Sequence, residues 1–252
     1  MRVTILGSGT SIPAPGRFPA GVLVESGDLA LLVDVGPGTL RRLPEAGVGL
    51  EQIGAVLLTH YHTDHTSDLA ALLFALRNPR YQGRPPLRVF GAPGLRDLVA
   101  HLTKAWPWLD PRGGYPLELQ EIGPGRFTVP PLQITAVPIE HTAQSLAYRL
   151  EAPSGATAAI SGDADVRDGL VDVARGVDLF VCECSFPDEL RCDGHLTPRL
   201  AGAAAAAADA KLLCLTHFYP ECEGVDLAAQ TRQAYTGDLV LAADLQRFDL
   251  QA

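Results

Sequence analysis

The sequence feature that most constrains this chain is the stretch LLTHYHTDH at residues 57–65. An apolar run at residues 55–58 leads into it, and residues 68–76 behind it have the apolar spacing of a helix. This order predicts a buried strand that ends in a loop crowded with polar side chains. Three imidazoles and one carboxylate within six positions are too dense for an ordinary polar turn whose histidines only hydrogen-bond locally. The stretch therefore favours a metal site.

The order of the ligands within this stretch predicts how they divide between metal ions. Alternate residues of an extended segment point the same way, so His60 and His62 can bind one ion together. Asp64 and His65 follow directly and can reach a second ion. The stretch resembles the signature of the metallo-β-lactamase fold superfamily. This resemblance implies an α/β fold, the αβ/βα four-layer sandwich, in which two sheets pack face to face with helices outside.

Strand and helix patterns alternate along the rest of the chain in two similar halves, which agrees with that architecture. We find neither a short internal repeat nor a low-complexity linker, so we expect one domain spanning residues 1–252. The expected strands lie at residues 2–6, 21–25, 30–34, 87–90, 117–122, 126–129, 132–138, 146–151, 157–161, 178–183 and 211–215. The expected helices lie at residues 68–76, 94–104 and 197–209.

Composition and charge limit the kind of protein and its partners. With 47% hydrophobic and 19% charged residues, 252 residues can bury a sizeable core. No apolar run approaches the roughly 18 residues that a membrane span needs, so we expect a cytoplasmic protein without a membrane partner. The net charge of −9 repels polyanions and argues against a protein that grips long nucleic acid through its phosphates. A small substrate remains compatible with this charge.

The five cysteines indicate reduced thiols rather than a disulfide framework, because they are odd in number and scattered through one part of a mid-sized chain. They are Cys182, Cys184, Cys192, Cys214 and Cys222. The first two could join Cys192 or Cys222 in a small metal site, but no second paired motif supports that interpretation.

Three further candidate ligands, His141, Asp163 and His217, stand where expected strands end. A single histidine after a strand is more often a packed or capping residue, so each is weak evidence alone. Ligands at the ends of rigid strands nevertheless suit a preformed site. By similarity to the superfamily, seven residues bind two metals and share Asp163 as the bridge: His60, His62 and His141 on one ion, and Asp64, His65 and His217 on the other.

The ligand types restrict the metal and the chemistry. Imidazoles and carboxylates without a thiolate suit two divalent ions, Zn²⁺ best, with Mn²⁺ or Fe²⁺ as alternatives. Position 62 is His, whereas the flavo-diiron branch has Glu there, which disfavours redox chemistry. Position 163 is Asp, whereas the main class of true β-lactamases has Cys there, which disfavours antibiotic hydrolysis.

Glu183 and His195 discriminate between branches of the superfamily. The segments around them, CECSF at residues 182–186 and DGHLTP at residues 193–198, resemble the Glu-bearing strand and the His-x-Thr motif of the ribonuclease Z-like branch. That branch includes tRNA 3′-processing endonucleases and small phosphodiesterases. The resemblance implies that His195 stabilises a phosphoryl oxygen or protonates the leaving group, and that Glu183 fixes its tautomer. The structural alternative for His195 is a turn residue near the helix N-cap Thr197.

Two departures from this branch bear on the substrate. tRNA-processing members carry a long Gly/Pro-rich arm that clamps tRNA between the third histidine and the bridging Asp, but only 22 positions separate His141 from Asp163 here, and two expected strands fill them. The cyclic phosphoribosyl phosphodiesterase of phosphonate breakdown carries an N-terminal cysteine cluster, whereas residues 1–50 here contain no Cys.

These features predict a dinuclear metal-dependent hydrolase, a phosphodiesterase that acts on a small phosphodiester or short nucleic acid. In this scheme a metal-bridging hydroxide attacks phosphorus, and Asp64 orients it or accepts its proton. The alternatives are a lactonase or glyoxalase II-like hydrolase of carbon esters or thioesters, and a tRNA 3′-processing-like endoribonuclease. A non-catalytic metal-binding regulator is a third class, against which complete ligation argues. A homodimer is compatible with the sequence.

Four other features have mainly structural interpretations. Asp34 is expected to support the metal loop from behind, either structurally or by contacting a ligand. His101 is expected to be an ordinary surface or core histidine. The Trp106 to Pro111 loop is expected to pack into the core, with an apolar lip over the site as the alternative. The basic segment at residues 77–88 is expected to be a connector, with a phosphate-binding rim as the alternative.

Overall fold

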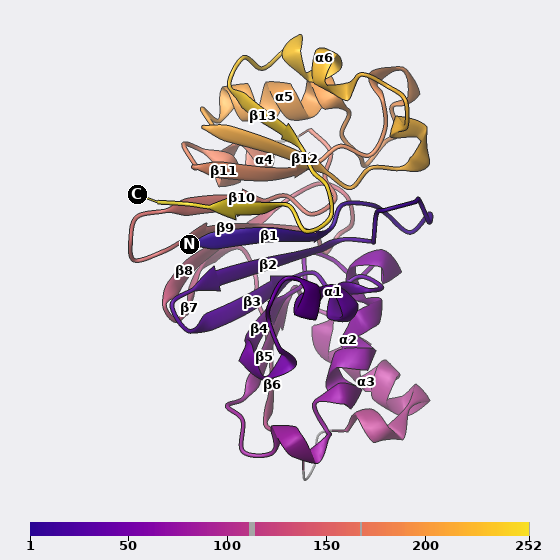
Figure 1. Cartoon of the computed structure of the whole chain (residues 1–252), viewed down its shortest axis with the longest axis vertical. Helices are drawn as coiled ribbons and strands as arrows, with labels where there is room; N and C mark the ends of the chain where they lie inside the picture. The colour runs from indigo at the N-terminus through magenta and orange to yellow at the C-terminus, as the bar shows by residue number, and fades with distance from the viewer. Residues whose placement is uncertain (111–113, 167, 252) are drawn as a thin grey trace.

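Two seven-stranded sheets face each other in the computed structural model, which describes residues 1–110, 114–166 and 168–251 (Figure 1). The first sheet has the order β14-β1-β2-β3-β4-β5-β6 and the second β13-β12-β11-β10-β9-β8-β7. The first contains β1 (Arg2–Gly7), β2 (Gly21–Ser26), β3 (Leu29–Val33), β4 (Ile53–Leu57), β5 (Leu87–Gly91), β6 (Leu117–Glu121) and β14 (Arg247–Asp249). The second contains β7 (Gly125–Val129), β8 (Leu132–Pro138), β9 (Leu146–Glu151), β10 (Thr157–Ile160), β11 (Leu179–Glu183), β12 (Leu212–Thr216) and β13 (Asp238–Leu241).

Helices cover the outer face of each sheet, which confirms the expected αβ/βα sandwich (Figure 1). The first sheet carries α1 (Thr39–Glu45), α2 (Thr63–Ala75) and α3 (Leu95–Ala105). The second carries α4 (Asp168–Ala174), α5 (Pro198–Ala207) and α6 (Leu227–Arg232). Among the described residues, none of these helices combines the length and the hydrophobicity that crossing a bilayer requires.

Both faces of the central strands are buried, for example in β2, β3 and β11, and this explains why these strands read as nearly continuous apolar runs. In β2, Val22 and Val24 belong to the core cluster that joins the two sheets, whereas Leu23 between them belongs to the cluster under α1 to α3. Alternate residues of a strand point to opposite faces, so one strand supplies both cores.

Four neighbouring strands run parallel in each sheet, β3 to β6 in the first and β10 to β13 in the second. The carboxyl ends of parallel strands meet at one edge of their sheet, and the loops after them therefore gather there. His60, Asp163, His195 and His217 lie in the segments after β4, β10, β11 and β12. His141 follows β8, which runs in the same direction as β10 because both are antiparallel to β9. The topology thus places these segments, far apart in the chain, beside one another.

The helix α2 begins at Thr63, five positions before the expected start at residue 68. Asp64 and His65 consequently lie in the first helical turn rather than in a loop. His62 takes an extended conformation at the N-cap, and the carboxylate of Asp64 suits the positive end of the helix dipole. The helix signal at residues 63–67 was hidden because the ligand residues there do not follow an apolar pattern.

The two tryptophans contradict the expected core packing. Trp106 is 52% exposed and Trp108 is 66% exposed. Leu109, the next residue, is buried and belongs to the core cluster under α1 to α3. The short 3-10 turn Pro107–Leu109 contacts α2 and α3, and it directs Leu109 rather than an indole inward. Pro111, the end of this loop, lies outside the described residues.

The basic segment at residues 77–88 uses two of its arginines to hold the backbone, as expected of a connector. Arg77 donates to the carbonyl of Asp110, and Arg84 donates to the carbonyl of Ile53 at the start of β4. His101, on α3, is exposed, in agreement with its expected role as an ordinary histidine.

Asp244, in the segment between β13 and β14, fixes the loop that follows β1. Its buried carboxylate accepts hydrogen bonds from the backbone N–H (2.9 Å) and hydroxyl (2.7 Å) of Ser8 and from the backbone N–H of Phe18 (2.8 Å). It also forms an ion pair with Arg42 at 3.0 Å. A residue near the carboxyl end of the chain thereby positions a loop near its amino end.

We predict that Asp244→Ala lowers the free energy of unfolding by about 3 kcal/mol, because it removes one of the two carboxylates that pair with Arg42 and leaves two backbone donors without their acceptor. Urea denaturation monitored by circular dichroism measures this. The matched control is Asp249→Ala, which removes only the exposed partner of Arg2 and should leave stability unchanged. Equal effects of the two substitutions would contradict the assigned importance of the Asp244 network.

Candidate metal centre

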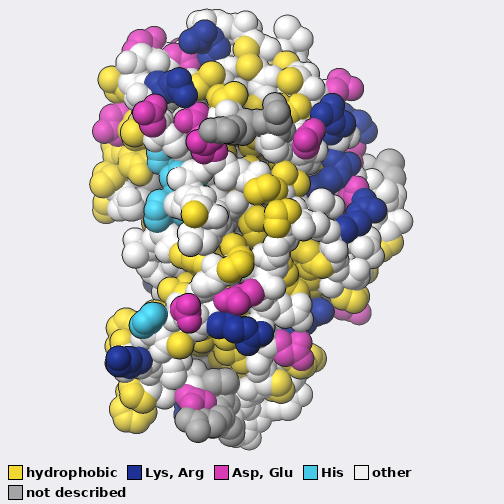
Figure 2. Space-filling model, turned by 180° about the vertical axis from the view of Figure 1, so that it is seen from behind, with side chains coloured by type: hydrophobic (Ala, Val, Ile, Leu, Met, Phe, Trp, Pro, Cys, Tyr) yellow, Lys and Arg dark blue, Asp and Glu magenta, His cyan; other side chains and the backbone are white. Residues whose placement is uncertain are grey.

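Seven side chains with metal-binding atoms converge where the loops after β4, β8, β10 and β12 meet α2. They form two groups, and the candidate ligand atoms within each group lie within 4.8 Å of one another: His60, His62, His141 and Asp163 in one, and Asp64, His65 and His217 in the other. The structure thus brings together all seven residues that the sequence singled out, in the predicted division. Histidine side chains are visible at one edge of the space-filling view (Figure 2).

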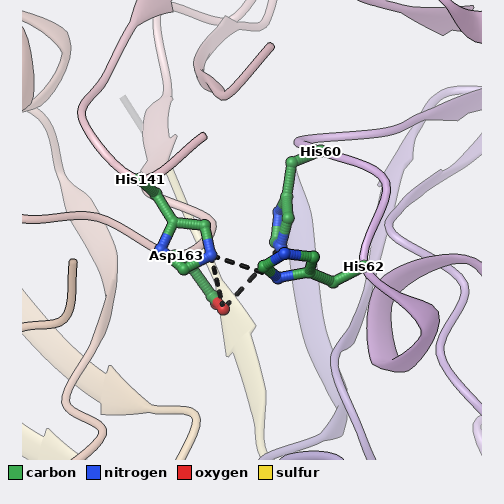
Figure 3. A group of neighbouring side chains, drawn as sticks. All are labelled: His60, His62, His141 and Asp163. Carbon is green, nitrogen blue, oxygen red and sulfur yellow. Dashed lines mark hydrogen bonds and ion pairs between the residues drawn. The ribbon is translucent and has the colours of Figure 1, made fainter. Parts of the chain in front are cut away.

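The four side chains of the first group point toward one another (Figure 3). The Nε2 atom of His141 lies 3.2 Å from His62 Nδ1 and 3.6 Å from Asp163 Oδ2. The Nε2 atom of His60 lies 3.8 Å from the same Asp163 oxygen. Two ligand atoms that each lie about 2.1 Å from a tetrahedral ion are about 3.4 Å apart, so these separations fit a shared ion.

The second group has the same spacing. His65 Nε2 lies 3.3 Å from His217 Nε2, and Asp64 Oδ2 lies 3.6 Å from His217 Nε2. The other oxygen of the Asp163 carboxylate, Oδ1, lies 3.1 Å from His65 Nε2 and 3.3 Å from His217 Nε2. Asp163 therefore presents one oxygen to each group.

Two buried atoms of the centre have no hydrogen-bond partner among the residues that the structure describes. They are His60 Nε2 and Asp163 Oδ1. A buried polar atom without a partner is costly, and such atoms are rare in folded proteins. Because the same two atoms face the other candidate ligands, a bound cation explains both of them.

The pKa shifts in the centre follow from burial and from neighbouring charges. Burial, together with the charge of His65, lowers the pKa of His60 to about 2, so this imidazole is neutral and able to bind a cation. Burial alone would raise the pKa of Asp163, but the neighbouring charges of His217 and His65 bring it well below its ordinary value. Burial opposes protonation of His65, but Asp163 and Asp34 raise its pKa well above the ordinary value.

Asp34 supports the metal loop from behind, and it does so partly by contacting a candidate ligand. Its carboxylate accepts hydrogen bonds from the backbone N–H (2.8 Å) and the hydroxyl (2.7 Å) of Thr59, and it lies 2.7 Å from His65 Nδ1. The contact indicates that His65 carries a proton on Nδ1 and donates it in a hydrogen bond to Asp34, so that Nε2 faces Asp163. Asp34 itself has a φ of 61°, a left-handed conformation that Asp tolerates better than most residues.

His141 is oriented by a residue that the sequence analysis missed. Its Nδ1 lies 2.8 Å from the carbonyl oxygen of Gly194, so Nε2 faces the first group. Asp165 holds the same glycine by accepting its N–H at 3.0 Å. Gly194 has a φ of 85°, a conformation that favours glycine. The glycine itself is the signal that the sequence offered.

Glu183 and His195, predicted as a pair, lie beside the two groups. His195 Nδ1 is 3.0 Å from Glu183 Oε1, and one ring nitrogen of His195 lies within 4.8 Å of the ligand atoms of Asp163 and His217. Burial lowers the pKa of His195, but the hydrogen bond and charge of Glu183 outweigh it and raise the pKa. The paired imidazole is thus set to carry or donate a proton next to the candidate metal site.

Comparisons with known proteins agree with this site. A family model described as a beta-lactamase superfamily domain matches residues 30–218. Ribonuclease Z of Mycobacterium marinum is 30% identical to the chain over 282 aligned positions, which cover 100% of the chain and 99% of the relative.

Solved structures show the same fold. The metallo-β-lactamase fold protein YhfI from Bacillus subtilis is 27% identical, with a TM-score of 0.84 over 98% of each chain. The short form of human tRNase Z is 23% identical, with a TM-score of 0.82 over 100% of each chain. Together with the His/Asp cluster, these likenesses indicate that the centre binds divalent metal ions.

We predict that Asp163→Ala empties both metal positions, because the two oxygens of its carboxylate face the two groups. Elemental analysis after reconstitution with Zn²⁺ and removal of loosely held metal should give two ions per wild-type chain and fewer than one in the variant. His101→Ala is the control and should retain the wild-type metal content. One or no ion in the wild type would remove the dinuclear arrangement.

Proposed function

The chain belongs to the metallo-β-lactamase superfamily, and from this premise we propose that it is a dinuclear metal-dependent phosphodiesterase of the ribonuclease Z-like kind. The observation that carries the proposal is the Glu183–His195 pair at 3.0 Å beside the two ligand groups. Such a pair gives a metallohydrolase a positioned proton donor for an alkoxide leaving group.

The residues present fit two divalent ions, for which we propose Zn²⁺. His60, His62 and His141 would hold one ion, Asp64, His65 and His217 the other, and Asp163 both. Five imidazoles and two carboxylates, without thiolate, are a ligand set that Zn²⁺ accepts well and Mn²⁺ or Fe²⁺ acceptably. When bound, such ions lower the pKa of water and neutralise charge on a phosphoryl group.

The side chains of the site supply the proton transfers in this proposal. Burial opposes ionisation of Asp64, but its hydrogen bond with His217 and the nearby imidazole charges lower its pKa to about 2. Its Oδ2 also accepts the backbone N–H of Ser11 at 3.1 Å, so Asp64 is a fixed carboxylate that can orient the attacking water. In this proposal His195 donates its proton to the leaving oxygen.

Small phosphodiesters or short oligonucleotides are the substrates that we propose. Between His141 and Asp163 the structure has only β9, β10 and their turns, which leaves no room for a tRNA-clamping arm. The alignment with the Mycobacterium marinum relative has 282 positions against 252 residues here, so that relative carries at least 30 residues without a counterpart. On the face in Figure 2, Lys and Arg side chains are interspersed with Asp and Glu.

A tRNA 3′-processing activity is the second candidate function. The 30% identity to a ribonuclease Z over the whole chain favours it. Hydrolysis of carbon esters or thioesters is less well supported, because it gives no role to the Glu183–His195 pair.

We predict that His195→Ala keeps both metals but lowers kcat on phosphodiesters by on the order of 10²–10⁴, the range of a positioned acid–base group. The loss should shrink for diesters of nitrophenol, since this leaving group needs little protonation. Steady-state kinetics with a series of aryl and alkyl leaving groups measures the effect.

His101→Ala is again the control and should leave kcat unchanged. Retention of phosphodiesterase activity within about threefold in His195→Ala would refute the role of His195. A wild-type preference for lactones or thioesters by kcat/KM would refute the phosphodiesterase itself.

We also predict that tRNA binds weakly and with steep salt dependence, since the net charge is −9 and the arm is absent. Electrophoretic mobility and cleavage assays with a tRNA precursor at physiological salt test this. Efficient cleavage at one site would instead establish the second candidate function.

A further inference from the structure

Ser185 lies fully buried between the two imidazoles of His195 and His217, just after β11. Its Oγ is 2.5 Å from Glu183 Oε2, 3.1 Å from His195 Nδ1 and 3.0 Å from His217 Nδ1. We propose that Ser185 is a positioning residue. Its hydroxyl links the carboxylate of Glu183 to two imidazoles, the proton-donating ring of His195 and the metal-binding ring of His217. The inference rests on the proposed function, since it takes His217 as a metal ligand and His195 as the proton donor.

The hydrogen-bond capacity of the hydroxyl decides the direction of each contact. A serine hydroxyl has one proton to donate and two lone pairs to accept with. The short distance to Glu183 Oε2 indicates that the hydroxyl donates its proton in a hydrogen bond to that carboxylate, because charged acceptors form the shorter and stronger hydrogen bonds. Ser185 Oγ therefore accepts the Nδ1 proton of His217.

The Nδ1 proton of His195 has two acceptors, Glu183 Oε1 at 3.0 Å and Ser185 Oγ at 3.1 Å. Both imidazoles thus carry a proton on Nδ1. The Nε2 atom of His217 is left as a lone-pair donor beside Asp163 Oδ1 at 3.3 Å, and Nε2 of His195 is left for the substrate.

The backbone of Ser185 is tied to the neighbours of both histidines. Its N–H donates to the carbonyl of Leu196 at 3.1 Å, and its carbonyl accepts the N–H of Tyr219 at 3.3 Å. Leu196 follows His195 and Tyr219 lies two positions after His217. The hydroxyl consequently has a fixed place relative to both rings, which a freely rotating surface serine would not have.

Zn²⁺ binding can distinguish a serine that positions His217 from a buried serine whose hydroxyl only needs hydrogen-bond partners. If Ser185 positions His217, Ser185→Ala should weaken one of the two Zn²⁺ sites about 10–100-fold, the usual cost of losing a partner that orients a metal-binding histidine. The other site, which His60, His62 and His141 form, should change by less than about threefold. Isothermal titration of the metal-free protein with Zn²⁺ measures both sites without any substrate.

Three further variants sharpen this experiment. Ser185→Thr keeps the hydroxyl and should restore the weakened site. Ser185→Cys has nearly the same volume but a poor donor and acceptor, and should reproduce the loss if Ser185→Ala does not fold. Ser26→Ala, at a buried serine of β2 away from the centre, should bind Zn²⁺ as the wild type does.

Kinetics of the Zn²⁺-loaded variants gives the second readout. Ser185→Ala should lower kcat on diesters with poor leaving groups, by less than His195→Ala does, because Glu183 still contacts His195. Equal weakening of both Zn²⁺ sites, or unchanged binding in both Ser185→Ala and Ser185→Cys, would overturn the inference. If the selective loss of one site is observed but the wild type cleaves no phosphodiester, the proposed function fails and the link from Ser185 to His217 stands.

Discussion

The buried carboxylate of Asp163 is the constraint on which the rest of the site depends. It lies at the end of β10 with one oxygen toward His60 and His141 and the other toward His65 and His217. A buried carboxylate is tolerated only when charged or hydrogen-bonding groups surround it. The two sheets satisfy this condition from both sides, and the same arrangement creates two adjacent cation positions.

Precise placement of so many imidazoles requires an outer layer of hydrogen bonds, and three of the rings each have a partner of this kind. Asp34 holds His65, the Gly194 carbonyl holds His141, and Ser185 holds His217. These partners come from the loops after β3 and β11 and the turn before α5, so the fold itself fixes the tautomers. Because every contact is at Nδ1, the Nε2 atoms of these three rings all face inward.

The sequence allowed the strands and the first four candidate ligands to be predicted because their signals are local, whereas His141, Asp163 and His217 needed the similarity to the superfamily. The ligand stretch at residues 57–65 and the apolar strands need only neighbouring residues to be recognised. The roles of Asp244, Ser185 and Gly194 depend on partners up to 236 positions away, so no local pattern reveals them. The exposure of Trp106 and Trp108 was missed for the opposite reason, since residue type suggests burial while the turn geometry decides it.

The charges around the centre limit the kind of substrate that it can hold. Asp34, Asp64, Asp163 and Glu183 bring four carboxyl groups into one hydrogen-bond network, which by itself repels an anion. Affinity for a phosphodiester must then come from bound divalent ions and from His195, at a single point. Each additional phosphate of a longer nucleic acid would extend from that point over a protein with a net charge of −9 and without a clamping arm. We therefore expect the attraction not to grow with substrate length, in line with the small phosphodiester substrate that we propose.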